Sequence, residues 1–237
     1  MTDPRDKLPS TAKQADVNAF LAEVAAMPAV AAAAGRGRLI FALDATASRE
    51  PTWGQACRIQ NEMFVETAAL GGLEIQLVHY YGFGAFEASS WFTRSDDLLG
   101  AMGAVQCMGG QTQIARVLDH ARAETARRKV NALVFVGDCM EEDVDALCHK
   151  AGQLGLLGVP AFVFHEGKDQ TAERAFRQIA KLTNGAYCRF DQNSAHQLRE
   201  LLAAVAVFAA GGRKALADFG RARGGAALLL TQQLGKG

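Results

Sequence analysis

Two aspartates each follow a short apolar segment that has the composition of a buried strand. Asp44 follows the segment 39–43, and Asp138 follows the segment 131–137. If these segments are neighbouring parallel strands, their carboxyl ends lie side by side, and so do the two carboxylates. Two like charges removed from water repel each other unless a proton or a cation neutralises them. The pair therefore indicates a cation-binding site.

Three hydroxyl side chains can complete that site. Thr46 and Ser48 follow Asp44 at two and four residues, which gives the motif DxTxS. Thr112 comes directly after the sequence GGQ, in a loop that is expected to open a helix. Together with Asp44 and Asp138 these side chains give five oxygen-donor groups, and none offers sulfur or imidazole. Such a set suits a hard divalent cation, Mg²⁺ first, with Mn²⁺ or Ca²⁺ as alternatives.

The elements that must position these residues alternate between strand and helix. Continuous apolar runs indicate strands buried on both faces, and amphipathic segments indicate the helices that cover them. The expected strands are 39–43, 73–80, 85–91, 131–137, 159–165 and 186–190. The expected helices are 16–27, 53–70, 95–105, 114–128, 143–154, 172–182 and 195–208.

This alternation predicts a Rossmann-like, doubly wound α/β fold with helices on both faces of a mostly parallel sheet. Residues 81–84 link the second and third strands so tightly that the third must return antiparallel, at an edge. Right-handed crossovers then favour the strand order 3-2-1-4-5-6. The first and fourth strands are neighbours in that order, at the switch point where such sheets bind ligands. Asp44 and Asp138 are therefore expected to meet there.

In this context the residues resemble the metal-ion-dependent adhesion site (MIDAS) of von Willebrand factor type A (VWA) domains. The resemblance rests on DxTxS after the first strand, GGxT in a loop and an Asp after the fourth strand, and it spans residues 35–208. It implies that Thr46 and Ser48 bind the metal directly and that Thr112 does so in some states. Asp44 and Asp138 then act directly or through water. The resemblance also implies a protein partner whose acidic side chain fills the remaining position on the metal.

Two positions depart from the pattern that is usual in extracellular VWA domains. Thr46 stands where Ser is common, which keeps the hydroxyl oxygen and adds a methyl group. Cys139 follows Asp138 where Gly is frequent, and we interpret its thiol as buried and inert. The site is thus expected to keep its oxygen donors.

Other polar residues near strand ends are expected to have structural roles. His79 and Tyr80 end the second strand and are interpreted as packing residues. His165 and Glu166 end the fifth strand and are interpreted as turn residues. The acidic run 141–143 is expected to favour a helix N-terminus, with tuning of the metal or repulsion of acidic partners as the alternative.

Composition narrows the class of protein. The chain has 237 residues with 25 basic and 25 acidic side chains, so no basic surplus favours nucleic acid as a partner. Five widely spaced cysteines without a CxxC pair are interpreted as free thiols of a reducing compartment. The polar first ten residues do not resemble a signal peptide, and no apolar stretch approaches the ~20 residues that span a bilayer. These features predict a cytoplasmic protein without a membrane partner.

The chain is expected to divide into three parts. Residues 1–35 form a flexible lead and a helix, residues 36–208 the VWA-like domain, and residues 209–237 a C-terminal tail. The tail is basic, contains two glycine pairs and carries an apolar run at 226–230. That run folds back on its own domain, docks on a partner or on a second copy of the chain, or is disordered.

The sequence favours a metal-dependent protein-interaction module that is not an enzyme. One alternative is a haloacid dehalogenase-like phosphohydrolase with Asp44 as its nucleophile. That motif requires a second acid two residues on, and Thr46 occupies this position. Another alternative is a scaffold that retains the motif but binds no metal.

Overall fold

The computed structural model describes residues 36–49, 72–190 and 195–223. Its strands are β1 (Gly37–Asp44), β2 (Leu73–Tyr81), β3 (Ala85–Phe92), β4 (Ala132–Gly137), β5 (Ala161–Glu166) and β6 (Ala186–Phe190). Its helices are the 3-10 turn η2 (Ala47–Arg49), α4 (Ser95–Gly103), α5 (Ile114–Arg127), α6 (Val144–Leu156), α7 (Gln170–Leu182) and α8 (Ala195–Arg223). The helices expected at 16–27 and 53–70 and the apolar run at 226–230 lie outside the described residues.

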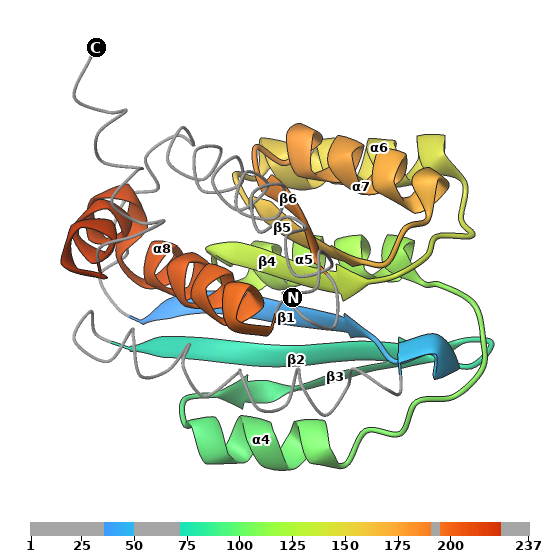
Figure 1. Cartoon of the computed structure of the whole chain (residues 1–237), viewed down its shortest axis with the longest axis horizontal. Coiled ribbons are helices and arrows are strands. Elements are labelled where there is room, and N and C mark those ends of the chain that lie inside the picture. Colours follow the sequence, from blue (N-terminus) through green and yellow to red (C-terminus); the bar gives the residue numbers. More distant parts are fainter. Residues whose placement is uncertain (1–35, 50–71, 191–194, 224–237) are drawn as a thin grey trace, which may run out of the picture.

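The strands form one sheet in the order β3-β2-β1-β4-β5-β6, which confirms the predicted order (Figure 1). Neighbouring strands are parallel except β2 and β3, so the predicted antiparallel edge strand is also confirmed. Every residue of β1, β4 and β5 is buried, whereas β3 is partly exposed. This difference is the physical reason why the central strands are continuous apolar runs while the edge strand contains polar residues.

The two faces of the sheet carry separate apolar cores because successive residues of a strand point in opposite directions. In β1, Phe41 and Leu43 pack on the face that α4 and α8 cover. Ile40 and Ala42 pack on the opposite face, with residues of α5, α6 and α7. Asp44 follows the same alternation and lies on the α5 side of the sheet.

Helix α8 continues past residue 208, where the domain was expected to give way to the tail. Ala209, Ala210 and Leu216 are buried in the core on the α4 and α8 face. Gly37 permits this packing, since a Cβ atom there would lie 2.3 Å from the Ala209 carbonyl oxygen. The first part of the expected tail therefore packs with the domain. No helix in the described ranges is both long and apolar enough to cross a membrane.

Candidate metal centre

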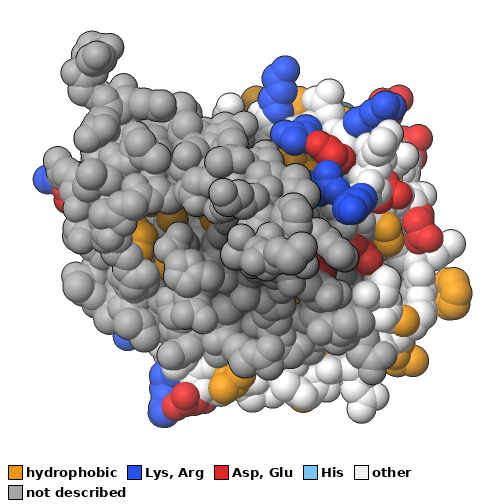
Figure 2. All heavy atoms as spheres, viewed as in Figure 1, with side chains coloured by type: hydrophobic (Ala, Val, Ile, Leu, Met, Phe, Trp, Pro, Cys, Tyr) orange, Lys and Arg blue, Asp and Glu red, His pale blue; other side chains and the backbone are white. Residues whose placement is uncertain are grey.

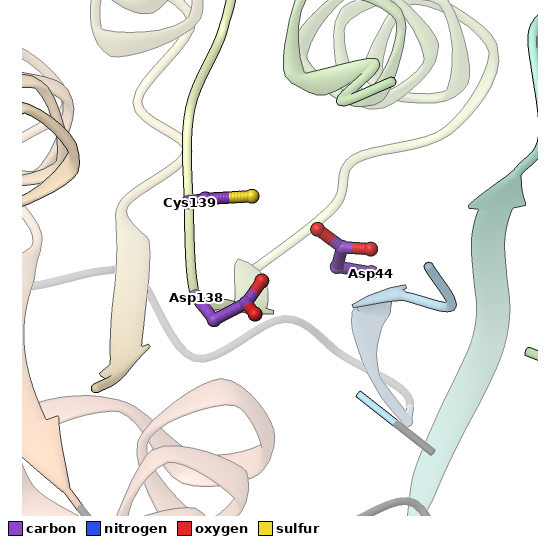
Figure 3. Close-up of side chains that lie close together, drawn as sticks. All are labelled: Asp44, Asp138 and Cys139. Atoms are coloured by element: carbon purple, nitrogen blue, oxygen red, sulfur yellow. The ribbon is translucent and has the colours of Figure 1, made fainter. Parts of the chain in front are cut away.

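The carboxyl ends of β1 and β4 bring two carboxylates and a thiol together. These strands are parallel neighbours, with Leu43 level with Val136, so the residues that follow them emerge side by side. One ligand atom each from Asp44, Asp138 and Cys139 lies within 4.8 Å of the other two. Figure 3 shows the Asp138 and Cys139 side chains extending from the β4 end toward Asp44. The switch point of the sheet thus holds a compact cluster of metal-ligating groups.

Asp44 is fully buried, and both of its oxygens accept hydrogen bonds. Oδ1 accepts from the Thr46 backbone N–H at 2.8 Å, and Oδ2 accepts from the Tyr80 hydroxyl at 3.0 Å. Burial raises the pKa of Asp44, and the Asp138 charge raises it further, against the lowering effect of the hydrogen bonds. A cation between the two carboxylates would offset both effects, because its positive charge stabilises the ionised carboxylates that burial and mutual repulsion disfavour.

Asp138 carries a polar atom that nothing in the described chain satisfies. Its Oδ1 is buried and accepts no hydrogen bond from the described residues. A buried carboxylate oxygen without a partner is costly, and native proteins normally provide one. A divalent cation bound by Asp138 and Asp44 would supply that partner. The donor set therefore fits a metal ion.

Thr46 and Ser48 form the hydroxyl side of the centre. The hydrogen bond from the Thr46 backbone N–H to the Asp44 carboxylate closes a tight local turn, of the kind that short acidic side chains commonly form. The turn places the Thr46 and Ser48 hydroxyl oxygens 3.1 Å apart. Thr46 is buried and Ser48 is exposed, so the pair extends from the carboxylates to the surface.

The structure joins Thr112 to the loop after Asp138. Its hydroxyl accepts from the Glu141 backbone N–H at 3.1 Å, and its own N–H donates to the Glu141 carboxylate at 3.2 Å. The Met108 N–H donates to the Ala45 carbonyl, which attaches the same loop to the segment after Asp44. The loop that carries Thr112 therefore links the other two loops of the centre, through Thr112 on one side and Met108 on the other. The compact cluster of carboxylates and thiol consists of Asp44, Asp138 and Cys139.

The acidic run after Cys139 serves two helices. Asp143 accepts from the Ala146 N–H and caps α6, as the sequence predicted for the run as a whole. Glu142 instead accepts from the N–H groups of Ile114 and Ala115 at the start of α5. Glu142 therefore favours a helix N-terminus as expected, at α5 instead of at the helix that follows it in the sequence. A loop carboxylate near one helix can reach another, and only the fold reveals which one.

Three residues near the centre have roles that the sequence analysis did not assign. Tyr80 donates to Asp44 across the β1–β2 pair, and the strand register places the two residues opposite each other. Cys139 belongs to the ligand cluster and to neither apolar core. Burial and the charges of Asp138 and Asp44 raise the pKa of its thiol to about 12. The only signal in the sequence was its position directly after Asp138.

His165 is the third such residue. It is fully buried in β5, and the predicted turn role was wrong. Its Nε2 lies 3.2 Å from the Asp138 carbonyl oxygen, which can only accept, so Nε2 carries the proton. Its Nδ1 then accepts from the Tyr187 hydroxyl at 2.8 Å. Burial lowers the pKa of His165, which agrees with a neutral ring that holds the Asp138 backbone in place.

The sheet order, the antiparallel edge and the polar switch point define a VWA-type α/β fold, and solved structures agree. Mussel byssus proximal thread matrix protein 1, in a form with a zinc-occupied MIDAS, has a TM-score of 0.59 and 17% identity, over 76% of this chain and 48% of that one. The SpRpn10 VWA domain has a TM-score of 0.58 and 11% identity, over 69% of this chain and 94% of that one. The vWF domain of the type V pili tip protein Mfa5 from Porphyromonas gingivalis has a TM-score of 0.56 and 11% identity, over 73% of this chain and 96% of that one.

Because the identities are low, these similarities establish the fold of the chain but not its ligands or its function. The chain spans about half the length of the mussel protein. No protein-family model matches the sequence, and no curated protein does.

Proposed function

We propose that this chain is a protein-interaction module that works through a divalent cation. Its ligands are Asp44, Thr46, Ser48, Thr112 and Asp138, and the cation is Mg²⁺, Mn²⁺ or Ca²⁺. The buried, unsatisfied Oδ1 of Asp138 beside the buried Asp44 carboxylate is the observation that carries this proposal. The zinc-occupied MIDAS of the mussel protein, which has the same fold, supports a divalent metal at this position.

Each side chain of the centre has a part in binding. Tyr80 and the Thr46 N–H hold the Asp44 carboxylate in one orientation. His165 and Glu141 hold the loops that carry Asp138 and Thr112. The bound cation supplies the positive charge that attracts an acidic side chain of the partner.

Three described residues around the centre are exposed and could contact a partner. Ser48, Gln111 and Glu141 are exposed on the three loops that surround the buried carboxylates. Basic and acidic side chains are intermixed on the described part of the face that Figure 2 shows. Such a surface favours a protein partner over nucleic acid, which requires a concentration of basic groups.

We also propose that the chain is not a phosphohydrolase. Both Asp44 oxygens accept hydrogen bonds, whereas a nucleophile needs an oxygen aimed at the substrate. The acid/base position of that enzyme class is occupied by Thr46, whose hydroxyl contacts Ser48. A screen with generic phosphate esters tests this proposal, and turnover that Asp44→Ala abolishes would establish the enzyme instead.

A cytoplasmic location completes the proposal. The four cysteines within the described residues, Cys107, Cys139, Cys148 and Cys188, form no disulfide. Free thiols are the usual state in a reducing compartment. Self-association through residues 226–230 stays a prediction, because these residues lie outside the described ranges.

Calorimetric titration with Mn²⁺ tests the metal site. We expect about one ion per chain and no binding in Asp44→Ala, because the remaining carboxylate cannot hold the ion alone. Asp96→Ala is the matched control, since Asp96 is an exposed aspartate of α4 outside the centre. Equal Mn²⁺ affinity in wild type and Asp44→Ala would show that the ion binds elsewhere. Capture of partners with Mg²⁺ and with EDTA then identifies what the loaded site recognises.

A further inference from the structure

The Cys139 thiol lies where a metal ligand would lie. Its sulfur is within 4.8 Å of a carboxylate oxygen of both Asp44 and Asp138. Ligand atoms held at about 2.0–2.3 Å by a tetrahedral ion lie about 3.3–3.8 Å apart, so side-chain rotations that shorten these distances by about 1 Å would close the cluster on a cation. Figure 3 shows the thiol directed into the space between β4 and the end of β1.

The surroundings of Cys139 differ from those of an inert structural thiol. Cys188 is buried in the apolar core, and Cys107 packs against that core. Cys139 is part of neither apolar core and has the two carboxylates as its neighbours instead. Beside it, the buried Oδ1 of Asp138 has no hydrogen-bond partner among the described residues. The carboxylate oxygen and the sulfur together present two adjacent ligand atoms.

We propose that Cys139 is a metal ligand and that the centre prefers a thiophilic divalent cation, of which Zn²⁺ is the physiological example, over Mg²⁺. This inference rests on the proposed metal site and names the cation class that the site selects. Mg²⁺ and Ca²⁺ are bound almost only by oxygen, whereas Zn²⁺ and Cd²⁺ bind thiolate sulfur strongly. When such a cation binds, the thiol loses its proton to the solvent and the sulfur bonds to the metal.

This ligand set leaves room for a partner. A thiophilic cation would take Asp44, Asp138 and Cys139 as its three protein ligands, in place of the five oxygen ligands proposed for a hard cation. Zinc sites with three protein ligands keep one position for water or another group. A partner's carboxylate would occupy that position in the proposed interaction. Cys139 would thus set which cation is held, and the cation would still present an open position to the partner.

Titration with Co²⁺ and Cd²⁺ tests the proposal through absorption, because only a metal–thiolate bond produces sulfur-to-metal charge-transfer bands. We expect these bands in wild type, at one ion per chain, and their loss in Cys139→Ser. Cys148→Ser is the matched control, since Cys148 lies on α6 outside the cluster and its variant should keep the bands. In Cys139→Ser the affinity for Zn²⁺ should fall at least about tenfold, while the affinity for Mn²⁺ should change little.

The outcomes separate this inference from the proposed metal site. Charge-transfer bands and Zn²⁺ affinity that are unchanged in Cys139→Ser overturn the thiolate ligand. If Asp44→Ala abolishes binding of every cation while Cys139→Ser changes neither the charge-transfer bands nor the Zn²⁺ affinity, the site stands and the inference falls. If wild type binds neither Zn²⁺ nor Mn²⁺, both fall.

A second measurement on wild type avoids any effect of substitution on folding. Zn²⁺ should slow alkylation of Cys139, followed by mass spectrometry, and leave Cys148 unaffected. Equal alkylation of Cys139 with and without bound Zn²⁺ overturns the inference.

Discussion

The two ends of strand β1 both bury charged side chains on the α5 side of the sheet, but they balance those charges differently. At the amino end, Arg38 meets the opposite charge of Glu124 at 3.2 Å. At the carboxyl end, Asp44 meets the like charge of Asp138. In the first arrangement the protein supplies the opposite charge, although the Arg38 Nε is buried without a hydrogen-bond partner among the described residues, whereas in the second only a cation or a proton can supply it.

Several contacts complete the pairing at the amino end. The Arg38 guanidinium lies 3.6 Å from the centre of the Trp91 ring, and the Trp91 indole N–H donates to Glu124 at 3.1 Å. Arg127 forms a second ion pair with Glu124 at 2.8 Å, and Arg38 also donates to the Arg128 carbonyl. These residues form a structural network, which we call the Arg38 network. The comparison teaches that buried charges indicate function only where the protein leaves them unbalanced.

The largest effect is expected from breaking the Arg38 network. Glu124→Ala should lower the free energy of unfolding by up to about 3–5 kcal/mol, because the buried Arg38 then keeps only the longer ion pair with Glu74 at 3.7 Å. Urea unfolding followed by circular dichroism measures the loss. The double variant Arg38→Met with Glu124→Leu is the control and should lose less than Glu124→Ala, since apolar residues of similar size replace the whole pair. A loss of less than about 1 kcal/mol in Glu124→Ala would mean that the pair is solvated like a surface ion pair.

A smaller effect is expected on the pH dependence of stability, with opposite signs at the two ends. Burial raises the pKa of Glu124, but hydrogen bonds from Trp91 and Arg38 outweigh it and the pKa falls below its usual value. The stability that Glu124 contributes is therefore present above its unfolded pKa of about 4.3 and is lost as the pH falls through the lower, folded value.

Asp44 behaves in the opposite way in metal-free protein. Its pKa is raised by burial and by Asp138, so its destabilising effect is complete above the folded pKa and disappears as the pH falls toward about 3.9. In EDTA, the stability difference between Asp44→Asn and wild type should therefore shift in favour of wild type as the pH falls. The loss in free energy of unfolding that Glu124→Gln causes relative to wild type should shrink as the pH falls. Urea unfolding over a pH series measures both, and a difference for Asp44→Asn that is independent of pH would contradict the raised pKa.

The smallest effect on stability is expected from Asp138→Asn in EDTA. The substitution removes one of two like charges and no hydrogen bond to Oδ1, so the free energy of unfolding should change by less than about 1 kcal/mol or rise. Metal should stabilise wild type by about 2.7 kcal/mol at a hundred times its Kd and should not stabilise the variant. Thermal unfolding with EDTA and with Mn²⁺ measures both effects. A strongly destabilised variant in EDTA would assign Asp138 a structural role like that of Glu124.

Much of the fold could be predicted because it depends on patterns along the chain. The apolar run before Asp44 marks a strand buried on both faces, and the short link at 81–84 forces an antiparallel return. The strong preference for right-handed crossovers then leaves few strand orders. The same argument placed Asp44 beside Asp138, since ligands gather at the carboxyl ends of strands that flank a switch point.

The rest depends on register and on side-chain direction, which local patterns do not specify. Nothing near Tyr80 in the sequence indicates that its hydroxyl reaches Asp44, because the contact follows from the β1–β2 register. Glu142 is adjacent to α6 in the sequence but caps α5. Helix α8 continues beyond residue 208 because its apolar residues find the core, a contact with residues far away along the chain.

The sequence by itself determined the strand order and the chemistry of the switch point, because periodicity and chain connectivity are properties of the sequence. Only the tertiary structure decided how that chemistry is balanced. It placed the Cys139 thiol close to two carboxylates, although the sequence favoured an inert thiol. Among the described residues, Asp138 Oδ1 has no hydrogen-bond partner, whereas the Glu124 carboxylate has three. The physical reason is that whether a buried charge is satisfied depends on distances of a few ångströms between residues that the chain keeps far apart.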